Sequence, residues 1–451
     1  METLQSYLER KHRELRLLND SLRAPLSLAE PRSVDEIIKT KFQLTAVLKA
    51  EHALHDWAAT ETAWAHSHQR RSGPFEFTYD YQRADLDVSG PCFYEFDGGC
   101  TGETVYTASG MAAISALLLA SAPTIGAADI LMLPGSYGET LELIQGYARH
   151  LRLVTMRQSL DETIAATSSP RMLLLDSCAP ASLFEAALRS QPAAFELLIF
   201  DSTCFSAGSG RIRRVLNWAR KVNIPVVMVR SHTKLDSLGA EYGRLGSAVF
   251  VHWNGSASSA LAAKLNRLRS EVRNAVRLLG GAAVPAHFPP YVGTSAYGEL
   301  TNRRMAAILR NTRRAARYFA SALPGLTAEL DFAHALYVTL DSPKPFDETT
   351  AGRAAAAMSD DLAAAGLPIR HAGSFGFDFA ATEWFHSPLT GQYSVRVAVP
   401  DLPTALWDDL TDAIARWWSR YYGASDRHRP ARSRKPRASI VGGVLTYDNG
   451  Y

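Results

Sequence analysis

The segment that decides the fold is Val226-Val-Met-Val-Arg-Ser-His-Thr-Lys-Leu-Asp-Ser-Leu-Gly239. Its first four residues are apolar, which predicts a short buried strand, and a polar turn containing Ser231, Thr233 and Lys234 follows. In an open α/β sheet, ligands bind beyond the carboxyl ends of the strands. A lysine there can form a Schiff base with a carbonyl cofactor, and the hydroxyls beside it can bind a phosphate. Alone, the segment also fits a surface lysine in a loop.

The middle of the chain repeats this pattern of short apolar runs separated by helical segments. Runs bounded by turn residues predict strands at residues 130–133, 151–156, 172–175, 197–200, 226–229 and 248–251. Between several of them, helical periodicity covers residues 111–120, 139–150, 183–189 and 212–221. Short apolar strands that alternate with helices predict a mostly parallel sheet, buried on both faces.

Shifts in composition divide the chain into four predicted segments. These are a helical N-terminal extension, a large α/β domain, a smaller α+β C-terminal domain and a basic flexible tail, at residues 1–70, 71–285, 286–423 and 424–451. Within the extension, the spacing of Leu4, Leu8, Leu15 and Leu18 predicts a first, amphipathic helix, and a second helix is predicted at residues 34–66. An irregular stretch is predicted at residues 72–102, at the start of the large domain. The alternative for the tail is an arm that binds anions or clasps a neighbouring subunit.

The composition argues against several classes of function. Of the 451 residues, 47% are hydrophobic and 21% are charged, which is ordinary for a globular protein. A net charge of +3 gives no argument for nucleic acid as a partner. The four cysteines form neither a C-x-x-C pair nor a cluster with zinc spacing, so we expect no metal site and a reducing compartment. No segment resembles a secretory signal or a membrane span, and we expect a cytoplasmic protein.

Two further segments place polar residues beside predicted strands and helices. Asp201 follows the apolar run 197–200, and a carboxylate there can keep the nitrogen of a pyridine ring protonated. An acid at a strand-to-helix turn can equally cap the helix. Ser109, Gly110 and Met111 open an apolar helix whose free N–H groups can bind a phosphate. The alternative there is an ordinary helix with a serine cap.

A fourth segment, Pro134-Gly-Ser-Tyr-Gly-Glu-Thr140, follows the strand predicted at residues 130–133. Its tyrosine, Tyr137, lies at the rim of the predicted sheet and can stack on a flat heteroaromatic ring. The alternative is a tight turn in which the tyrosine simply packs against its neighbours.

In this order, the four segments resemble the Cys/Met-metabolism family of fold-type I pyridoxal-5′-phosphate (PLP) enzymes, which includes cystathionine γ-synthase, cystathionine γ-lyase and methionine γ-lyase. The resemblance runs from about residue 79 to residue 418, and its most specific parts are Ser109-Gly-Met-Ala-Ala-Ile114 and Ser231-His-Thr-Lys234. It implies the fold-type I architecture, with a large domain on a mostly parallel sheet and a smaller α+β C-terminal domain. It also implies PLP as cofactor, an amino acid as substrate, and a homodimer or homotetramer with shared active sites.

The resemblance implies a role for each matching residue. Lys234 holds PLP as a Schiff base and moves the α-proton of the substrate, while Asp201 faces the pyridine nitrogen. Tyr137 stacks on the ring and takes part in proton transfer, which Tyr81 assists. Arg396 binds the substrate carboxylate through its planar guanidinium, with Ser374 as a second substrate-binding residue. The other cofactor-binding residues within the same subunit are Ser109, Gly110, Met111, Thr203, Ser231 and Thr233. Tyr81 and Arg83 bind the cofactor of a neighbouring subunit.

The sequence departs from the family pattern at several positions. Pro180 stands where the family has an asparagine that bonds the phenolic oxygen of the cofactor, so that role cannot be transferred. Glu139 replaces a glycine beside Tyr137, and an added helix is predicted at residues 212–221. Together with the helical extension and the basic tail, these departures indicate a divergent member of the family, and they suggest specialised metabolism.

The activity that the resemblance favours is γ-elimination or γ-replacement on an amino acid with a γ leaving group. Candidate substrates are an activated homoserine, a γ-halo amino acid and a sulfonium such as S-adenosylmethionine, with carbon–carbon bond formation, cyclisation or alkyne formation as conceivable sequels. β-Elimination and transamination are alternatives because they use the same lysine, aspartate and arginine. A binding or regulatory module that acts through the basic tail is the alternative of another class. His232 and His371 fit structural roles better than catalytic ones.

Overall fold

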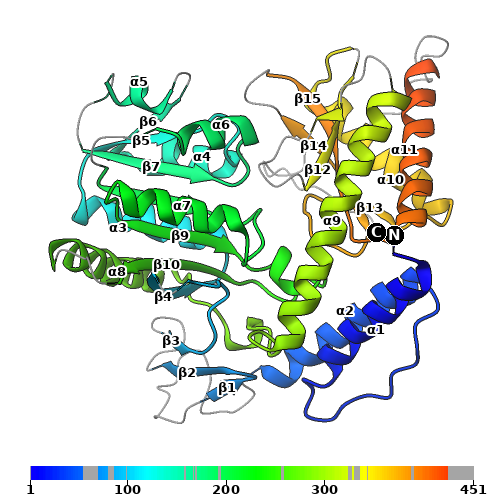
Figure 1. Cartoon of the computed structure of the whole chain (residues 1–451), viewed down its shortest axis with the longest axis horizontal. Helices are drawn as coiled ribbons and strands as arrows, with labels where there is room; N and C mark the ends of the chain where they lie inside the picture. Colours follow the sequence, from blue (N-terminus) through cyan, green and yellow to red (C-terminus); the bar gives the residue numbers. More distant parts are fainter. Residues whose placement is uncertain are drawn as a thin grey trace, which may run out of the picture.

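A computed structural model describes residues 2–53, 70–79, 86–97, 99–156, 159–165, 167, 170–190, 195–254, 259–323, 328–329, 336–342, 344–386 and 391–424. Two regions of strands and helices lie side by side, and a pair of N-terminal helices packs against them (Figure 1). The predicted basic tail, together with Tyr81 and Arg83, lies outside the described residues.

A seven-stranded sheet forms the centre of the first region. Its order is β4-β10-β9-β8-β7-β5-β6, at Cys100–Thr107, Gly246–Trp253, Val226–Ser231, Leu197–Asp201, Arg171–Asp176, Ala128–Met132 and Leu151–Thr155. The strands from β9 to β6 pair in parallel, while β10 is antiparallel to both of its neighbours. Every residue of β5 and β8 is buried, as expected for strands with both faces covered. The predicted fold class is confirmed.

Two layers of helices cover this sheet. One face packs in a common core with α3, α4 and α8, at Gly110–Thr124, Gly138–Tyr147 and Ser259–Leu279. The other face packs with α5, α6 and α7, at Leu160–Ala165, Ala181–Ala187 and Gly210–Lys221. Successive strand residues point to opposite faces, so Leu197 and Ile199 join the first core while Leu198 and Phe200 join the second.

A five-stranded sheet forms the centre of the second region. Its order is β11-β12-β15-β14-β13, at Ala328–Glu329, Tyr337–Leu340, Tyr393–Ala398, Ala380–His386 and Ile369–His371. It is mostly antiparallel, and only β13 and β14 pair in parallel. Three helices share its core, α9, α10 and α11, at Ser295–Ala322, Glu348–Ala364 and Thr404–Ala424. Figure 1 shows α9 running along this sheet on the side nearer the first region.

The N-terminal helices are α1, Leu4–Asn19, and α2, Val34–His52, capped by the side chains of Thr3 and Ser33. Both pack on the rest of the protein, because Tyr7 and Ile37 join the core of the second sheet and Leu15 and Leu48 join a core that includes Phe288. The first predicted helix is confirmed. The second was predicted to continue to residue 66, and residues 54–69 lie outside the described part of the chain.

The stretch at residues 72–102 is not irregular as predicted. It contains most of a small antiparallel sheet, β1-β2-β3, at Arg70–Ser72, Phe75–Tyr79 and Leu86–Ser89, as well as the start of β4. Phe75 and Phe77 are buried on either side of the less buried Glu76, which is the alternation of a half-buried strand. The richness in glycine and aromatic residues masked that alternation in the sequence.

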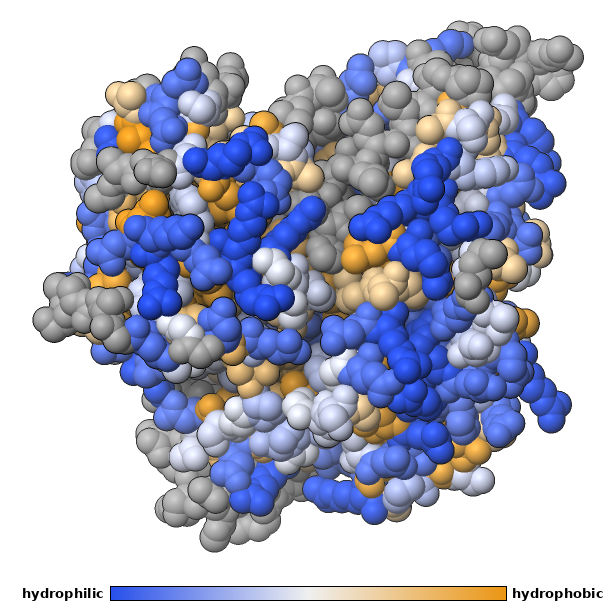
Figure 2. All heavy atoms as spheres, viewed as in Figure 1, coloured by the Kyte–Doolittle hydropathy of each residue, from blue (hydrophilic) through white to orange (hydrophobic). Residues whose placement is uncertain are grey.

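Figure 2 shows the distribution of hydrophilic and apolar side chains on one face of the molecule. Hydrophilic side chains cover most of the face drawn in Figure 2, and apolar side chains appear there in small groups. Among the described residues, none of the helices combines the length and apolar character that crossing a membrane requires.

Candidate active site

Lys234 lies in the turn after β9, just before a short 3-10 helix at Leu235–Ser237. Its Nζ donates a hydrogen bond to Ser374 Oγ at 2.5 Å and lies 5.9 Å from the centroid of the Phe375 ring. The loop that contains Ser374 and Gly376 closely approaches the turn that contains Lys234. A Cβ on residue 376 would lie only 2.7 Å from the Lys234 carbonyl oxygen, so glycine permits this approach. The predicted lysine therefore lies where the carboxyl end of the large sheet meets the loop that precedes β14.

Hydroxyl groups and a helix N-terminus converge beside this lysine. Ser231 Oγ lies 2.9 Å from Thr233 Oγ1, and Ser109 caps α3 by accepting a hydrogen bond from the Ala112 amide at 3.0 Å. A Cβ on Gly110 would lie 3.0 Å from the Ser231 Cβ, so glycine lets the start of α3 approach the end of β9. The N–H groups in the first turn of α3 have no partner within the helix, which suits an anion such as phosphate.

Thr203 connects this cradle to the predicted acid. Its hydroxyl accepts a hydrogen bond from the Ser231 amide at 3.1 Å, and its own amide donates to Asp201 Oδ1 at 2.8 Å. The sheet thus fixes the spacing between the hydroxyls after β9 and the carboxylate at the end of β8. Met111, in the first turn of α3, accepts a weak hydrogen bond at its Sδ from Thr140 Oγ1 at 3.9 Å.

A second buried acid stands beside Asp201, and it was not predicted as a site residue. Asp176 ends β7 and is the register partner of Asp201 across the parallel pair. Its carboxylate accepts hydrogen bonds of 2.7 Å from the backbone amides of Tyr137 and Cys178. The available sequence signal was an acid at the end of a buried apolar run, the same signal that identified Asp201.

Both acids have raised pKa values because they are buried. Burial, and then the charge of Asp201, raises the pKa of Asp176 to about 7. Burial also raises the pKa of Asp201, although hydrogen bonds from Thr203 and the charge of Arg230 act in the opposite direction. A buried pair of carboxylates of this kind favours either a shared proton or a nearby cation.

Tyr137 lies at the rim of the site, as the first residue before α4. Its side chain is 40% exposed, and burial of the remainder together with the charge of Glu139 raises the pKa of its phenol. The charges of Cys178 and Glu383 act on it as well, which places the tyrosine between the two sheets. The phenol therefore stays protonated at neutral pH, and its hydroxyl can donate a hydrogen bond to a bound group.

Arg396 lies on β15 in a pocket of aromatic rings. Its guanidinium carbon is 4.3 Å from the centroid of the Tyr337 ring and 4.6 Å from that of Phe385, and its Nε donates to Glu383 Oε1 at 2.8 Å. The ring of Tyr337 in turn contacts that of Phe375 at 5.6 Å between centroids, next to Lys234. The ion pair with Glu383, its cross-strand partner, was not predicted, since the two residues belong to different strands.

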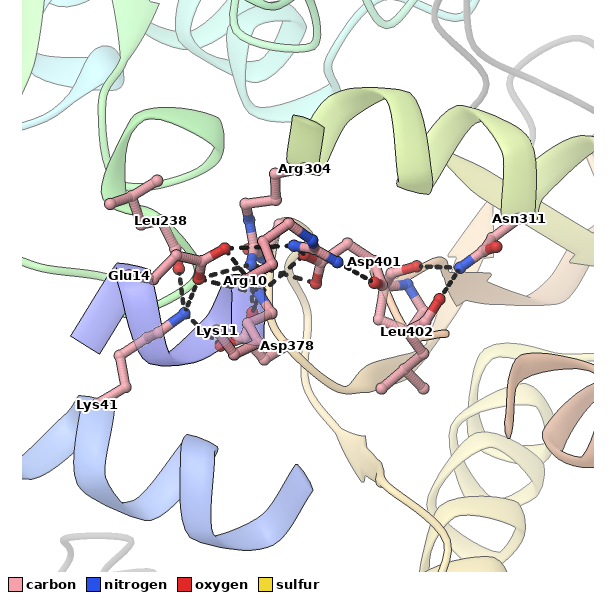
Figure 3. A network of polar contacts seen from close by, with 12 residues as sticks. Arg10, Lys11, Glu14, Lys41, Leu238, Arg304, Asn311, Asp378, Asp401 and Leu402 are labelled. Atoms are coloured by element: carbon pink, nitrogen blue, oxygen red, sulfur yellow. Dashed lines mark hydrogen bonds and ion pairs between the residues drawn. The ribbon is translucent and has the colours of Figure 1, made fainter. Parts of the chain in front are cut away.

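A buried charge cluster that the sequence did not predict lies next to the loop that contains Leu238, four residues after Lys234 (Figure 3). Side chains from α1, α2 and α9 meet those of two loops there, and none is more than 4% exposed. The members are Arg10, Lys11, Glu14, Lys41, Arg304, Asp378 and Asp401. Lys41 Nζ lies 2.5 Å from Asp378 Oδ2, and Arg10 Nη1 lies 2.6 Å from Asp401 Oδ2.

The buried charge cluster also holds the backbone on both sides of the lysine. Lys41 Nζ donates to the carbonyl of Leu238 at 2.7 Å, four residues after Lys234. Arg304 Nη2 donates to the carbonyl of Gly376 at 2.5 Å, two residues after Ser374. The N-terminal helices are therefore connected directly to both loops that form the Lys234–Ser374 contact.

The two histidines make contacts that support a structural interpretation. His232 is buried, with Nδ1 at 2.7 Å from Asp236 Oδ2 and Nε2 at 2.8 Å from Ser247 Oγ. His371 Nδ1 lies 2.8 Å from the carbonyl of Thr382 on the neighbouring strand. Within the described residues there is no group of three or more metal-ligating side chains placed to hold a metal ion.

The order of the strands in the large sheet and the presence of a smaller second sheet match the architecture of fold-type I PLP-dependent enzymes. No family model and no curated protein matches the chain. Its fold is similar to the crystal structure of metB from Corynebacterium glutamicum, with a TM-score of 0.53 and 16% identity, covering 84% of this chain and 98% of that one.

Two other solved structures match less well. Cystathionine gamma synthase from Xanthomonas oryzae pv. oryzae, in complex with cystathionine, gives a TM-score of 0.46 at 18% identity, covering 70% of this chain and 82% of that one. A putative histidinol-phosphate aminotransferase from Erwinia carotovora atroseptica gives 0.41 at 15% identity, covering 71% and 82%. At 16% identity the comparison with metB shows the fold alone, and any function is argued from the residues described above.

Proposed function

We propose that this chain is a PLP-dependent enzyme that binds its cofactor covalently through Lys234 and catalyses γ-elimination or γ-replacement on an amino acid. The observation that carries the proposal is the convergence of Lys234, the hydroxyls of Ser231 and Thr233, and the carboxylate of Asp201 at one end of the sheet. When bound, PLP supplies a protonated pyridine ring that stabilises negative charge at the substrate α-carbon.

The residues present fit such a group at both of its ends. The cradle formed by the start of α3 with Ser231 and Thr233 has the donors that a phosphate requires, and Gly110 keeps it open. The hydrogen bonds described for Asp201 come from the uncharged Thr203. A protonated ring nitrogen would add the cation that stabilises a buried carboxylate next to a second acid.

Each side chain of the site has its own role in the proposed reaction. Lys234 accepts and returns the α-proton, and Ser374 orients its Nζ through the 2.5 Å hydrogen bond. Arg396, sandwiched between two rings and fixed by Glu383, orients the substrate carboxylate. Tyr137, whose phenol stays protonated, donates a proton to the departing γ group.

The finer parts of the proposal concern substrate, assembly and location. The γ leaving group belongs to an activated homoserine, a γ-halo amino acid or a sulfonium, and the enzyme serves specialised metabolism. The chain forms a cytoplasmic homodimer or homotetramer in which Tyr81 and Arg83 complete the site of a neighbouring subunit. The division into an extension, a large domain, a small domain and a basic tail, at 1–70, 71–285, 286–423 and 424–451, is part of the same proposal.

The covalent part is tested by reducing the PLP-loaded protein with borohydride and mapping the labelled peptide. We expect the label on Lys234 and its disappearance in Lys234→Ala, while Lys264→Ala, which removes a lysine paired with Glu196 just before β8, at the opposite end of that strand from Asp201, keeps it. A label on any other lysine would overturn the proposal.

The reaction type is tested by adding each candidate substrate and measuring the released leaving group, ammonia and keto acid. Release of a γ leaving group supports the proposal. Release of a β substituent alone would favour β-elimination, and amino transfer to a keto acid without a leaving group would favour transamination.

A further inference from the structure

Two cysteine thiols are in contact at the end of the large sheet. Cys178 Sγ and Cys204 Sγ lie 3.3 Å apart. Cys178 comes two residues after Asp176 at the end of β7, and Cys204 comes three residues after Asp201 at the end of β8. Since β7 and β8 are adjacent parallel strands, the sheet itself brings the two thiols together.

The same turns hold the two buried acids. The Cys178 amide donates to Asp176 Oδ1 at 2.7 Å, and the Cys204 amide donates to Ser177 Oγ at 3.0 Å. Cys204 is fully buried and Cys178 is half-buried, in the core where Phe375 and Tyr337 of the second region meet the first. The pair therefore lies between the acids and the arginine pocket, in the middle of the candidate active site.

We propose that Cys178 and Cys204 are an oxidation site that forms a reversible disulfide, with a small neutral peroxide as oxidant. Cys178, the more exposed thiol, is oxidised first to a sulfenic acid and releases one water; the Cys204 sulfur then displaces the second oxygen as water. In total, two S–H bonds break, one S–S bond forms, and hydrogen peroxide is reduced to two molecules of water.

The geometry requires only a small movement. A disulfide has an S–S distance of about 2.05 Å, so the sulfur atoms now 3.3 Å apart must approach by about 1.2 Å. Contact with Cys204 and burial raise the pKa of Cys178, so the thiolate is scarce and the reaction is slow compared with that of an activated thiol. Proximity accelerates only the closing step, because the attack of Cys204 on the oxidised Cys178 is intramolecular.

The disulfide is coupled to the cofactor site through the backbone of the two turns. Drawing the sulfur atoms together pulls on the Cys178 amide, which bonds Asp176, and on the segment that joins Cys204 to Asp201. Oxidation therefore displaces the acids and weakens the retention of PLP. This second part rests on the proposed function, whereas disulfide formation does not.

The linkage is tested on the intact protein with hydrogen peroxide, followed by denaturation, alkylation of the remaining thiols and peptide mapping. The reduced protein should carry an alkyl group on all four cysteines, and the oxidised protein on two of them, with one peptide pair joined through Cys178 and Cys204. Dithiothreitol should restore all four. The exposed Cys92 offers a matched control, because Cys92→Ser should keep the linkage and Cys178→Ser should lose it.

Retention is measured as the PLP that remains with the protein after gel filtration. Oxidation should lower it at least several-fold, dithiothreitol should restore it, and peroxide should leave it unchanged in Cys178→Ser. Persistence of four alkylated cysteines, or a linkage that includes Cys92, would overturn the oxidation site. A Cys178–Cys204 linkage with unchanged retention would overturn the coupling alone, while a linkage in a protein that never binds PLP would refute the proposed function and leave the oxidation site standing.

Discussion

Buried carboxyl groups have raised pKa values in the candidate active site, and Asp378 in the buried charge cluster has a lowered one. Asp176 and Asp201 lie side by side with backbone amides as donors, and their pKa values are raised. In the buried charge cluster, burial alone would raise the pKa of Asp378, yet Arg304, Lys11 and Lys41 hold it well below its ordinary value. In the buried charge cluster the acids contact cations directly, whereas the hydrogen bonds described for Asp176 and Asp201 come from uncharged groups, and the charge of Arg230 lowers the pKa of Asp201 without reversing its rise.

The largest effect should come from removing the reacting amine while leaving the acid pair and the buried charge cluster intact. Lys234→Ala should lower turnover by at least about 10²–10⁴-fold because it removes the proton-transferring amine. Its free energy of unfolding should stay within about 1 kcal/mol of the wild-type value. Steady-state kinetics and urea denaturation measure the two quantities, and a large loss of stability would instead show that Lys234 is structural.

The next effect should come from breaking the buried charge cluster. Asp378→Ala leaves Lys11, Lys41 and Arg304 buried without one of their shared carboxylates. We expect the free energy of unfolding to fall by about 3–5 kcal/mol, as measured by urea denaturation. A loss below about 1 kcal/mol would mean that the remaining acids, Glu14 and Asp401, compensate fully.

A smaller effect on the free energy of unfolding should come from a change in pH, and its sign identifies the group that causes it. The folded-state pKa of Asp176 is about 7, well above that of an unfolded aspartate, so the folded protein binds more protons between about pH 4 and 7. In protein freed of PLP, the free energy of unfolding should therefore fall as pH rises through this window, by up to about 1.4 kcal/mol per pH unit. Asp176→Asn should remove this contribution, which denaturation at each pH would measure.

The buried charge cluster should show the opposite sign. The lowered pKa of Asp378 contributes stability that is present above the pKa of an unfolded aspartate and is lost as pH falls below about 4. The free energy of unfolding of the wild-type protein is compared with that of Asp176→Asn at each pH. If the difference, wild type minus variant, rose steadily from pH 4 to pH 7, the assignment of the raised pKa to the acid pair would be contradicted.

The smallest effect should come from an exposed ion pair that resembles the buried charge cluster in chemistry alone. Arg314 and Asp408 pair at 2.6 Å between α9 and α11, and their side chains are 38% and 44% exposed. Arg314→Ala should lower the free energy of unfolding by only about 0–1 kcal/mol because solvent screens the pair. Urea denaturation in parallel with Asp378→Ala would measure the difference, and equal losses would remove the distinction between buried and exposed pairs.

The sequence predicted the sheet and the lysine turn because both leave local patterns. An apolar run, a polar turn and an acid after a strand can each be recognised within about ten residues. The partners Asp176 and Glu383 were missed because the contacts that matter cross from one strand to the next. The buried charge cluster was missed for the same reason on a larger scale, since Arg10 and Asp401 are 391 residues apart. The functional roles of all the predicted site residues stay predictions, and Tyr81 and Arg83 also lie outside the described residues.

The contact between Arg10 and Asp401 also has a consequence for synthesis on the ribosome. At about 5–20 residues per second, translation needs about 20–80 seconds to add the 391 residues that separate the two. During that interval the first helix has emerged, and Arg10 and Lys11 can pair with Glu14 of the same helix but still lack Asp378 and Asp401. The nascent chain must keep this basic amphipathic segment in water or on a chaperone, and docking of the first helix becomes one of the last steps of folding.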